Sequence, residues 1–480
     1  MPETHPSPPP PGFADAVSTA AARRELWGWS ALAISSLAVA GVFALLLALS
    51  RTPGLGEVVS WPAAFFHKGL VIHVVFSFVV WFLAVFGALL HLATARLAGG
   101  APRLAPLGIL AVWMAVGASV LLFAPAFLDR GEPTLNDYVP AIVDPLYYAG
   151  LVALAGALAL AVLRLLVNLA GRRAAWDPFV HAIAASGFAY LVALLCFGLA
   201  YWRLADDPPS HAFNEDLFWG GGHVLQFVNV GLLVAAWWVL AAAPGGRAAR
   251  EWPLTGAAAW IALFALPGPF LYFTLEPFSG VQAEAFTDLQ YALAPPAAVV
   301  AAVIGLGAAR RWRAGAAPSW KDPAFLCLAL SFAVFATGGV LGLFVDGADT
   351  RTPAHYHGVI AGINLAFMGL FFVVFLPLLG RPPRRGKLLY AQVWLFAGGQ
   401  TVAALGLFWA GGYGAPRKTA GAAQGLDDVG AIAGMALNGV GALLAVLGGV
   451  LFIWTVAAAL LRKPQEPQEP QTSEAGKEKA

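Results

Sequence analysis

Twelve apolar runs divide this chain of 480 residues, and each is long enough to cross a lipid bilayer. A membrane-spanning helix needs roughly 20 mostly apolar residues to cover about 30 Å of hydrocarbon. In lipid, every backbone N–H and C=O group must be bonded within the chain, so each run is expected to be a helix. The runs lie at about residues 26–50, 65–92, 104–128, 141–168, 178–202, 217–243, 253–275, 285–309, 323–345, 354–380, 388–410 and 430–461. The sequence therefore predicts an all-α integral membrane protein, a bundle of twelve transmembrane helices.

The composition excludes several classes of protein. Hydrophobic residues make up 59% of the chain and charged residues 11%, which excludes a soluble enzyme and a disordered chain. The net charge of +2 is too small to indicate a nucleic-acid partner. Both cysteines, Cys196 and Cys327, lie in apolar runs, so neither a disulfide framework nor a thiolate metal cluster is expected.

The two ends differ from the apolar middle. Residues 1–25 and 462–480 are rich in proline and polar residues, so both are expected to be disordered tails around a membrane domain at 26–461. Twelve spans place both tails on one side, and that side carries 21 of the 28 lysines and arginines. By the positive-inside rule, the sequence predicts a multi-pass protein of a bacterial-type cytoplasmic (inner) membrane, with both termini in the cytoplasm.

Four histidines are expected at one depth in the outer half of the bilayer. His73, His223, His355 and His357 lie near the starts of the second, sixth and tenth spans, which all begin at the outer face. Polar side chains within a span are costly and usually functional. His67 lies nearer the membrane surface and is the alternative to His73. The remaining four, expected to be interfacial or solvated, are His5, His91, His181 and His211.

His355 and His357 stand two residues apart at the start of the tenth span. Each residue turns an α-helix by about 100°, so the two rings are expected to point to opposite sides. One metal ion could not easily be held by both, whereas two flat cofactors could lie on either side of the helix. Because a haem iron takes one or two axial imidazoles, four histidines at one level would serve two haems.

Two further features accompany the histidine layer. Three glycines at 220–222 precede His223 and would let the backbone approach a flat cofactor closely. Arg417 and Lys418 follow the eleventh span at the outer face, where cations are scarce. Haem propionates are anions that need cations at the rim, so this pair is expected just above the histidines, with Arg351 as a further contact.

This pattern resembles subunit I of the haem–copper oxidase superfamily over roughly residues 26–461. The most specific string is residues 349–357, which ends in Ala-His-Tyr-His, and residues 416–418 resemble the family's Pro-Arg-Arg propionate clamp. The resemblance implies that His73 and His357 are the ligands of a low-spin haem. It also implies that His355 is the ligand of a high-spin haem and that His223 is a ligand of a second metal.

The first departure from the family concerns the second metal. The family supplies a His-His pair from the seventh helix, but no histidine occurs here between His223 and His355. A copper site of three imidazoles therefore cannot be built. Substitutes are the carboxylates Glu276, Asp288 and Glu215, whose oxygens favour iron over copper, and the alternative is no second metal.

The second departure concerns a tyrosine. Many oxygen-reducing members have a tyrosine one turn after the histidine of the sixth helix, where this chain has Phe227 after His223. The family's nitric oxide reductases also lack this tyrosine, so the departures favour NO as the substrate. Oxygen stays open because Tyr272 or Tyr291 could lie near, and Gln226 is a further polar residue expected beside the site.

The resemblance implies a respiratory oxidoreductase, a terminal oxidase or nitric oxide reductase subunit. Its cofactors would be two haems, expected to be of type b, and an uncertain second metal, iron or copper. Electrons would come from a cytochrome c-like or cupredoxin-like subunit on the outer face, because this chain has no Cys-x-x-Cys-His motif of its own. The alternatives are a non-catalytic haem protein for electron transfer, sensing or haem handling and, more distantly, a haem-free twelve-helix transporter.

Overall fold

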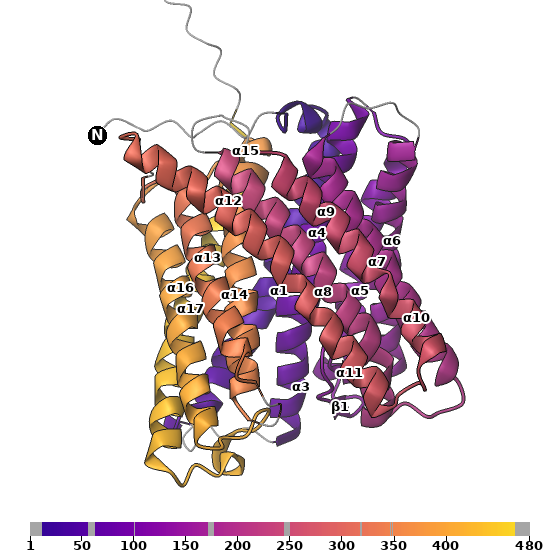
Figure 1. Cartoon of the computed structure of the whole chain (residues 1–480), viewed down its shortest axis with the longest axis vertical. Helices are drawn as coiled ribbons and strands as arrows, with labels where there is room; N and C mark the ends of the chain where they lie inside the picture. Colours follow the sequence, from indigo (N-terminus) through magenta and orange to yellow (C-terminus); the bar gives the residue numbers. More distant parts are fainter. Residues whose placement is uncertain are drawn as a thin grey trace, which may run out of the picture.

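The computed structural model describes residues 12–55, 63–99, 101–170, 177–243, 250–316, 319–345, 347 and 349–465. Within these residues, twelve helical runs are long and apolar enough to cross a membrane, which confirms the predicted bundle (Figure 1). The expectations for residues 1–11, residues 466–480 and His5 fall outside the described residues.

Most spans are single helices. These are α1 (Ala20–Arg51), α5 (Ala105–Phe127), α6 (Pro145–Ala170), α7 (Pro178–Arg203), α8 (His211–Ala242), α13 (Pro323–Gly342), α16 (Lys387–Gly412) and α17 (Val429–Leu461). The other spans consist of consecutive segments, namely α3 (Ala63–Val74), η2 (Val75–Val80) and α4 (Trp81–Ala98); α9 (Trp252–Ala265) and α10 (Pro267–Thr274); α11 (Gly280–Leu289), η3 (Gln290–Leu293) and α12 (Ala294–Arg313); α14 (Arg351–Leu370), η4 (Phe371–Phe375) and α15 (Leu376–Leu378). Short elements outside the spans are η1 (Asp15–Val17), η5 (Gly421–Gln424) and an antiparallel pair of strands, β1 (Pro133–Thr134) and β2 (Ala141–Ile142).

Polar caps fix where several helices begin. The Asp177 carboxylate accepts a hydrogen bond from the Phe179 backbone N–H at 3.0 Å, and Asp322 does the same for Ala324 at 2.8 Å. A proline follows each aspartate at the first helical position. An acceptor at the N-cap satisfies an N–H group that the helix leaves unbonded, and proline fits the position after it.

The second, sixth and tenth spans form the centre of the bundle. In their most apolar stretches 72%, 78% and 83% of the residues are buried within the protein, more than in any other described span. These spans contain α3–α4, α8 and α14–η4, and they carry His73, His223, His355 and His357. The four histidines are therefore on the helices most shielded from lipid.

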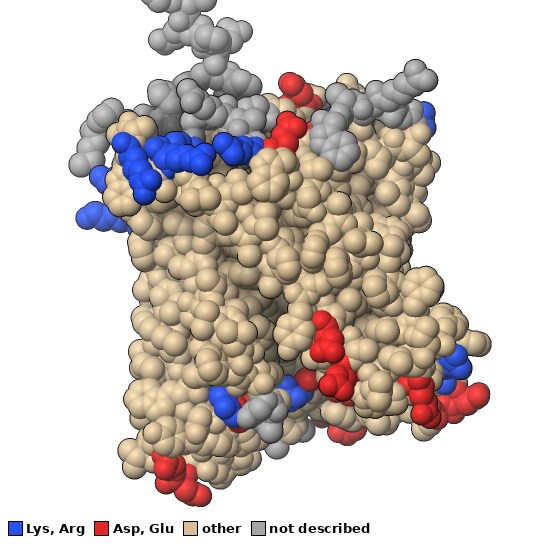
Figure 2. Space-filling model, in the orientation of Figure 1, with Lys and Arg blue, Asp and Glu red and all other residues tan. Residues whose placement is uncertain are grey.

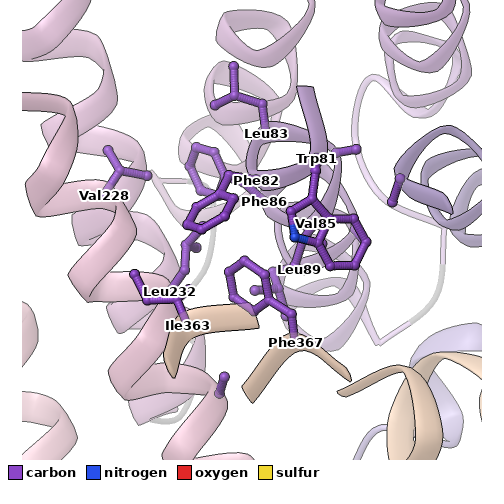
Figure 3. Packing of buried hydrophobic residues seen from close by; sticks show 14 of the residues in the cluster. Trp81, Phe82, Leu83, Val85, Phe86, Leu89, Val228, Leu232, Ile363 and Phe367 are labelled. Carbon is purple, nitrogen blue, oxygen red and sulfur yellow. The ribbon is translucent and has the colours of Figure 1, made fainter. Parts of the chain in front are cut away.

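Aromatic side chains lock the inner spans together. Trp81 stacks on Phe371 with 5.6 Å between ring centroids, and its indole N–H donates to the Asn364 amide oxygen at 2.8 Å. Phe82 meets Phe367 edge-on at 5.2 Å, and apolar chains of α8 close the same layer (Figure 3). Because interiors pack densely, this layer fixes how the three spans lie beside one another and so where their histidines stand.

Wide turns interrupt two of the inner spans. The π-helical segment η2 begins two residues after His73, and η4 follows α14, which carries His355 and His357. Such turns are rare and often lie near functional sites. Each changes the angular position of the side chains beyond it relative to those before it.

The ordered chain reaches further toward the N-terminus than predicted. Within residues 12–25, which the sequence predicted to be disordered, α1 begins at Ala20 and the Phe13 side chain is buried. The Phe13 ring lies 5.0 Å from the Phe179 ring, and the Arg96 guanidinium lies 4.5 Å above it. The contacts of Phe13 thus hold this segment against the bundle, although its polar composition predicted disorder.

His91 is buried, so its predicted interfacial position was wrong. Its Nδ1 lies 3.0 Å from a carboxylate oxygen of Glu25, which also accepts a hydrogen bond from Arg164 Nη1 at 2.6 Å. The three side chains come from α4, α1 and α6, and all three are buried. Each of the three residues lies near the end of its span, where the three helices meet. Their charged groups therefore pair inside the bundle instead of facing solvent.

Charge separates toward the two ends of the molecule. On the face in Figure 2, most lysines and arginines form a row at one end, where α12 ends with Arg310, Arg311 and Arg313. This is the end at which α1 begins and α17 finishes, and it is called the termini end below. Acidic residues on this face gather mainly at the opposite end (Figure 2).

Candidate functional site

His73 and His357 stand close to each other from two inner spans. The His73 Nδ1 lies 3.1 Å from the Ala40 carbonyl oxygen of α1. His357 lies within electrostatic range of His73 and hydrogen-bonds to the Gln400 side chain of α16. An Nδ1–H that donates to a carbonyl leaves Nε2 free as a metal ligand, the arrangement usual for ligating histidines. His73 is thus held in a ligating orientation.

His355 points to a different neighbour from His357. Its Nδ1 lies 2.8 Å from the Gly338 carbonyl oxygen of α13. Gly338 and Gly358 pack backbone to backbone at this place, and a side chain on either would collide with the other helix. The two-residue spacing therefore sends the rings of α14 toward separate partners, as the sequence predicted from helix geometry.

His223 lies in a cage of aromatic rings. Its Nδ1 lies 2.7 Å from the Trp219 carbonyl oxygen, one turn earlier in α8. Ring centroids of Tyr138, Trp219 and Phe286 lie 4.5, 4.8 and 6.0 Å from that of its imidazole. The Tyr138 ring packs against Gly222, where a side chain would meet it at once. Because Gly222 has no side chain, the Tyr138 ring of the loop can pack directly against the helix backbone beside His223.

Arg417 and Lys418 are joined by a carboxylate of the protein itself. The Asp137 side chain lies 3.2 Å from Arg417 Nη2 and 2.7 Å from Lys418 Nζ, and Lys418 also donates to the Leu135 carbonyl. Burial alone would raise the pKa of Asp137, but the hydrogen bonds and charges of Lys418 and Arg417 outweigh it, so the pKa lies below its usual value. The expected clamp therefore holds an anion here, and it is Asp137.

Arg351 is paired with a neighbour in sequence. Its guanidinium makes a bidentate contact with Asp349, with Nη2 2.6 Å and Nε 2.9 Å from Oδ2. Asp349 also bridges to Pro416 through the backbone, which joins the start of α14 to the clamp. Arg351 thus lies beside the clamp, but a carboxylate already engages its guanidinium.

The three carboxylates suggested for a second metal do not gather around His223. Glu276 and Asp288 are exposed, and Glu215 accepts a hydrogen bond from the Asp137 backbone N–H at 3.0 Å. Across the part of the chain that the structure describes, no three His, Cys, Asp or Glu side chains form a group able to hold a metal. The residues present therefore do not fit a second metal beside His223.

The other residues expected near the site have varied surroundings. Gln226 donates to the Gly222 carbonyl at 3.3 Å, and Phe227 is fully buried. Tyr272 is buried and its ring contacts Phe286. The Phe286 ring in turn contacts His223, so Tyr272 reaches His223 only through Phe286. Two further residues are peripheral, since Tyr291 is 76% exposed and His67 packs its ring against Phe66.

Sequence reasoning missed two residues that the structure brings to the histidines. Tyr138 comes from the loop between β1 and β2, and no pattern in the sequence marks that loop as folding inward. Arg51 ends α1 within electrostatic range of His357 and Tyr356. The sequence did offer one indication of a role for Arg51, because it is one of the few cations expected on the outer side. The buried Nε and Nη2 of Arg51 have no hydrogen-bond partner in the described structure.

The comparison with protein families decides what this arrangement belongs to. The model for cytochrome c and quinol oxidase polypeptide I matches residues 27–451. The chain belongs to this family. The match confirms the resemblance found in the sequence, and membership makes the chain a multi-pass membrane protein of a family of respiratory oxidoreductases.

Two similar proteins and one solved structure span most of the chain, and a third similar protein spans about a third of it. An uncharacterized protein of Aquifex aeolicus is 29% identical over 75% of this chain and 86% of its own length. An uncharacterized protein of Rickettsia prowazekii is 24% identical over 89% and 94%. Cytochrome c oxidase subunit 1 of Thermus thermophilus is 29% identical over 31% of this chain and 28% of its own. A solved heme-copper terminal oxidase dimer has a TM-score of 0.79 at 16% identity, covering 93% of this chain and 85% of that chain, which shows a shared fold.

Members of this oxidase family typically bind haem, and the described residues fit one between α3 and α14. His73 has its Nε2 free, and His357 lies near it on the facing helix. Arg51 lies within electrostatic range of His357, and its buried Nε and Nη2, which have no hydrogen-bond partner among the described residues, would pair with an acidic edge of the group. A buried donor without a partner is costly, so Arg51 indicates an anion at this place.

Proposed function

We propose that this chain is the haem-bearing catalytic subunit of a respiratory enzyme that reduces a diatomic gas, with NO favoured over O2. The observation that supports the proposal is that His357 lies within electrostatic range of His73 of another span, while His355, two residues earlier, faces the Gly338 carbonyl of α13. When bound, the haems would supply electron transfer and an open iron position for the gas. The protein's own part is to hold four imidazoles at fixed places.

His73 and His357 would hold the low-spin haem, and His355 the high-spin haem. His355 takes its orientation from the Gly338 carbonyl, and His357 from Gln400. Because separate helices hold the two rings of α14, each can present its Nε2 to a different cofactor. Arg51 and the cations of the clamp would balance the propionate charges.

The preference for NO rests on what surrounds His223. The described residues offer no metal-binding group there, and the seventh span carries no histidine. Oxygen is the second candidate because the Tyr138 ring lies 4.5 Å from the His223 ring, so a phenol is available from the loop where α8 has Phe227. The partial similarity to a Thermus cytochrome c oxidase subunit supports the same candidate.

The location and partners belong to the same proposal. The row of cations at the termini end supports a cytoplasmic position for both termini in a bacterial-type inner membrane (Figure 2). The histidines would then lie nearer the outer face, where a cytochrome c-like or cupredoxin-like subunit could deliver electrons over a short path.

Spectra of the purified chain, combined with gas consumption, test the proposal. We expect a Soret band with low-spin and high-spin components and faster consumption of NO than of O2. His357→Ala should remove the low-spin component and keep part of the high-spin one, and His355→Ala should do the reverse. His211→Ala, an exposed histidine at the start of α8, is the matched control and should change neither.

Other results would select other functions. Haem without consumption of either gas would indicate a non-catalytic haem protein for electron transfer, sensing or haem handling. A folded protein that takes up no haem would leave the transporter as the remaining hypothesis. Low-spin haem retained in His357→Ala would contradict the ligand assignment.

A further inference from the structure

A cavity of about 180 Å³ opens where α8, α10 and α11 meet, at the end of the bundle opposite the termini. We call it the acidic cavity. Its walls include two carboxylates, a phenol and three aromatic rings, contributed by Glu215, Asp216, Tyr272, Trp219, Phe278 and Phe286. No lysine, arginine or histidine lines it within the described chain. The cavity is separate from the histidine layer, since the Trp219 and Phe286 rings lie between it and His223.

The two carboxylates leave the cavity with unbalanced negative charge. Glu215 is half-buried, and one oxygen accepts a hydrogen bond from the Asp137 N–H. Asp216 is also half-buried, and its carboxylate makes no side-chain hydrogen bond or ion pair with any described residue. Its electrostatic neighbours are the carboxyl of Asp207 and the phenol of Tyr272, neither of which is a cation. A cation from outside the chain would therefore be favoured here.

Tyr272 provides a second and independent sign of a ligand. Its side chain is 98% buried, since only 2% of its surface is exposed, and it lines the acidic cavity. Its hydroxyl lies against Gly220, another residue of the lining, and makes no hydrogen bond with the described residues. The side chain is buried, but its hydroxyl reaches the cavity without a partner among the described residues, so it is available to hydrogen-bond a group that enters the cavity from outside.

The walls select the kind of cation. Trp219, Phe278 and Phe286 surround the cavity with rings, and rings attract an ammonium group through their negative faces. Carboxylates and a phenol oxygen accept hydrogen bonds from its N–H groups. The volume exceeds that of one water, about 30 Å³, several times over, so the cavity suits a small organic ammonium better than a bare metal ion.

The surroundings indicate a source for the ammonium group. Phe270 and Phe273 of α10 and Val281 of α11 are 64%, 63% and 65% exposed, so the flank next to the cavity is strongly apolar. In a membrane protein such a flank at the end of the spans faces the boundary between acyl chains and headgroups. We infer that the acidic cavity binds the ammonium headgroup of a phospholipid such as phosphatidylethanolamine, with its acyl chains along α10.

Lipid binding to the delipidated full chain tests this inference without reference to gas reduction. The chain in detergent is titrated with phosphatidylethanolamine, with phosphatidylglycerol as the probe that lacks an ammonium group, and retained lipid is counted by native mass spectrometry. We expect a preference of about tenfold for phosphatidylethanolamine, and a loss of most of that preference in Asp216→Asn. Glu284→Gln removes an exposed carboxylate of α11 that does not line the cavity, so it should keep the preference.

A second variant and a third probe complete the design. Tyr272→Phe removes only the unpartnered hydroxyl and should weaken binding by about threefold, which decides the matter if Asp216→Asn does not fold. Free ethanolamine should compete with the lipid for the same place. Equal retention of both lipids by the wild type, or wild-type binding by folded Asp216→Asn, would overturn the inference. Asp216-dependent binding of ethanolamine without lipid binding would reject the lipid and leave a soluble amine.

Discussion

The Tyr138 ring lies against the His223 imidazole, with 4.5 Å between centroids and 50° between planes. Tyr138 adopts a left-handed backbone conformation, with φ at +64°, which is uncommon outside glycine. The same loop sends Asp137 to the Arg417–Lys418 clamp. One loop outside the spans therefore contacts both His223 and the Arg417–Lys418 pair.

Replacing Tyr138 separates its ring from its hydroxyl. Tyr138→Ala should lower the free energy of unfolding by about 1–3 kcal/mol, because the ring between Gly222 and His223 is lost. Tyr138→Phe keeps the ring, and the hydroxyl makes no hydrogen bond with the described residues, so stability should change by about 0.5 kcal/mol or less. If the phenol serves O2 reduction, Tyr138→Phe should slow O2 consumption and spare NO consumption. Equal slowing of both gases would argue against that role.

The contact between Gly338 and α14 should be intolerant of any side chain. A methyl group there would meet the backbone of Gly358 and Val359, so Gly338→Ala should cost about 1–3 kcal/mol and displace the carbonyl that holds His355. The measurements are thermal unfolding and the high-spin haem signal. Gly339→Ala is the matched control because nothing lies within 4 Å of a methyl at that place. Equal behaviour of the two variants would contradict the packing described.

Asp137 should make stability depend on pH in the acid range only. The pKa of Asp137 is lowered in the folded protein, so its contribution is present above the unfolded value of about 3.9 and is lost as pH falls through the folded value. Asp137→Asn should therefore lower stability by about 1–2 kcal/mol at neutral pH. The difference from wild type should stay constant between about pH 5 and 8 and shrink below about pH 4. Melting temperatures across this range check it, and a difference that grows on acidification would contradict the assignment.

The buried pair of Glu25 and Arg164 should respond differently to single and double replacement. Glu25→Leu leaves the Arg164 guanidinium unpaired inside the bundle and should cost about 3–5 kcal/mol, whereas Arg164→Met should cost less because His91 Nδ1 still lies 3.0 Å from the Glu25 carboxylate. The double variant removes both charges and should recover most of that loss. Chemical unfolding of the three variants measures the coupling, and additive losses would show that the pair is not coupled.

If His73 and His357 hold a low-spin haem as proposed, Arg51 should influence its reduction potential. Removing a cation beside the iron favours the oxidised form, so Arg51→Gln should make the potential more negative. Redox titration followed by absorption gives this value without any turnover. Arg203→Gln, an exposed arginine at the same end of the bundle, should leave the potential unchanged. A wild-type potential in Arg51→Gln would remove Arg51 from the cofactor site.

The sequence was sufficient for the spans because lipid imposes a strong and local rule on every apolar run. The structure adds that His73, His223, His355 and His357 lie on the three most buried of the described spans, which suits polar residues that must avoid lipid. Helix geometry also predicted that His355 and His357 would meet different partners, as they do.

The remaining features depend on which segments meet, and no local pattern carries that information. Tyr138 reaches His223 from a loop of mixed composition, and Phe13 anchors a polar tail. His91 was misjudged because its partner, Glu25, lies on another span. Each of these contacts joins residues far apart along the chain.

The pairing of Glu25 with Arg164 also bears on how the protein is made. The two residues are 139 positions apart, and a chain emerges from the ribosome with its N-terminus first. The carboxylate of the first span therefore waits without its arginine until the fourth span has been synthesised. Until then, the partner that the described structure offers Glu25 is His91 of the second span, so the order of synthesis gives this carboxylate its histidine before its arginine.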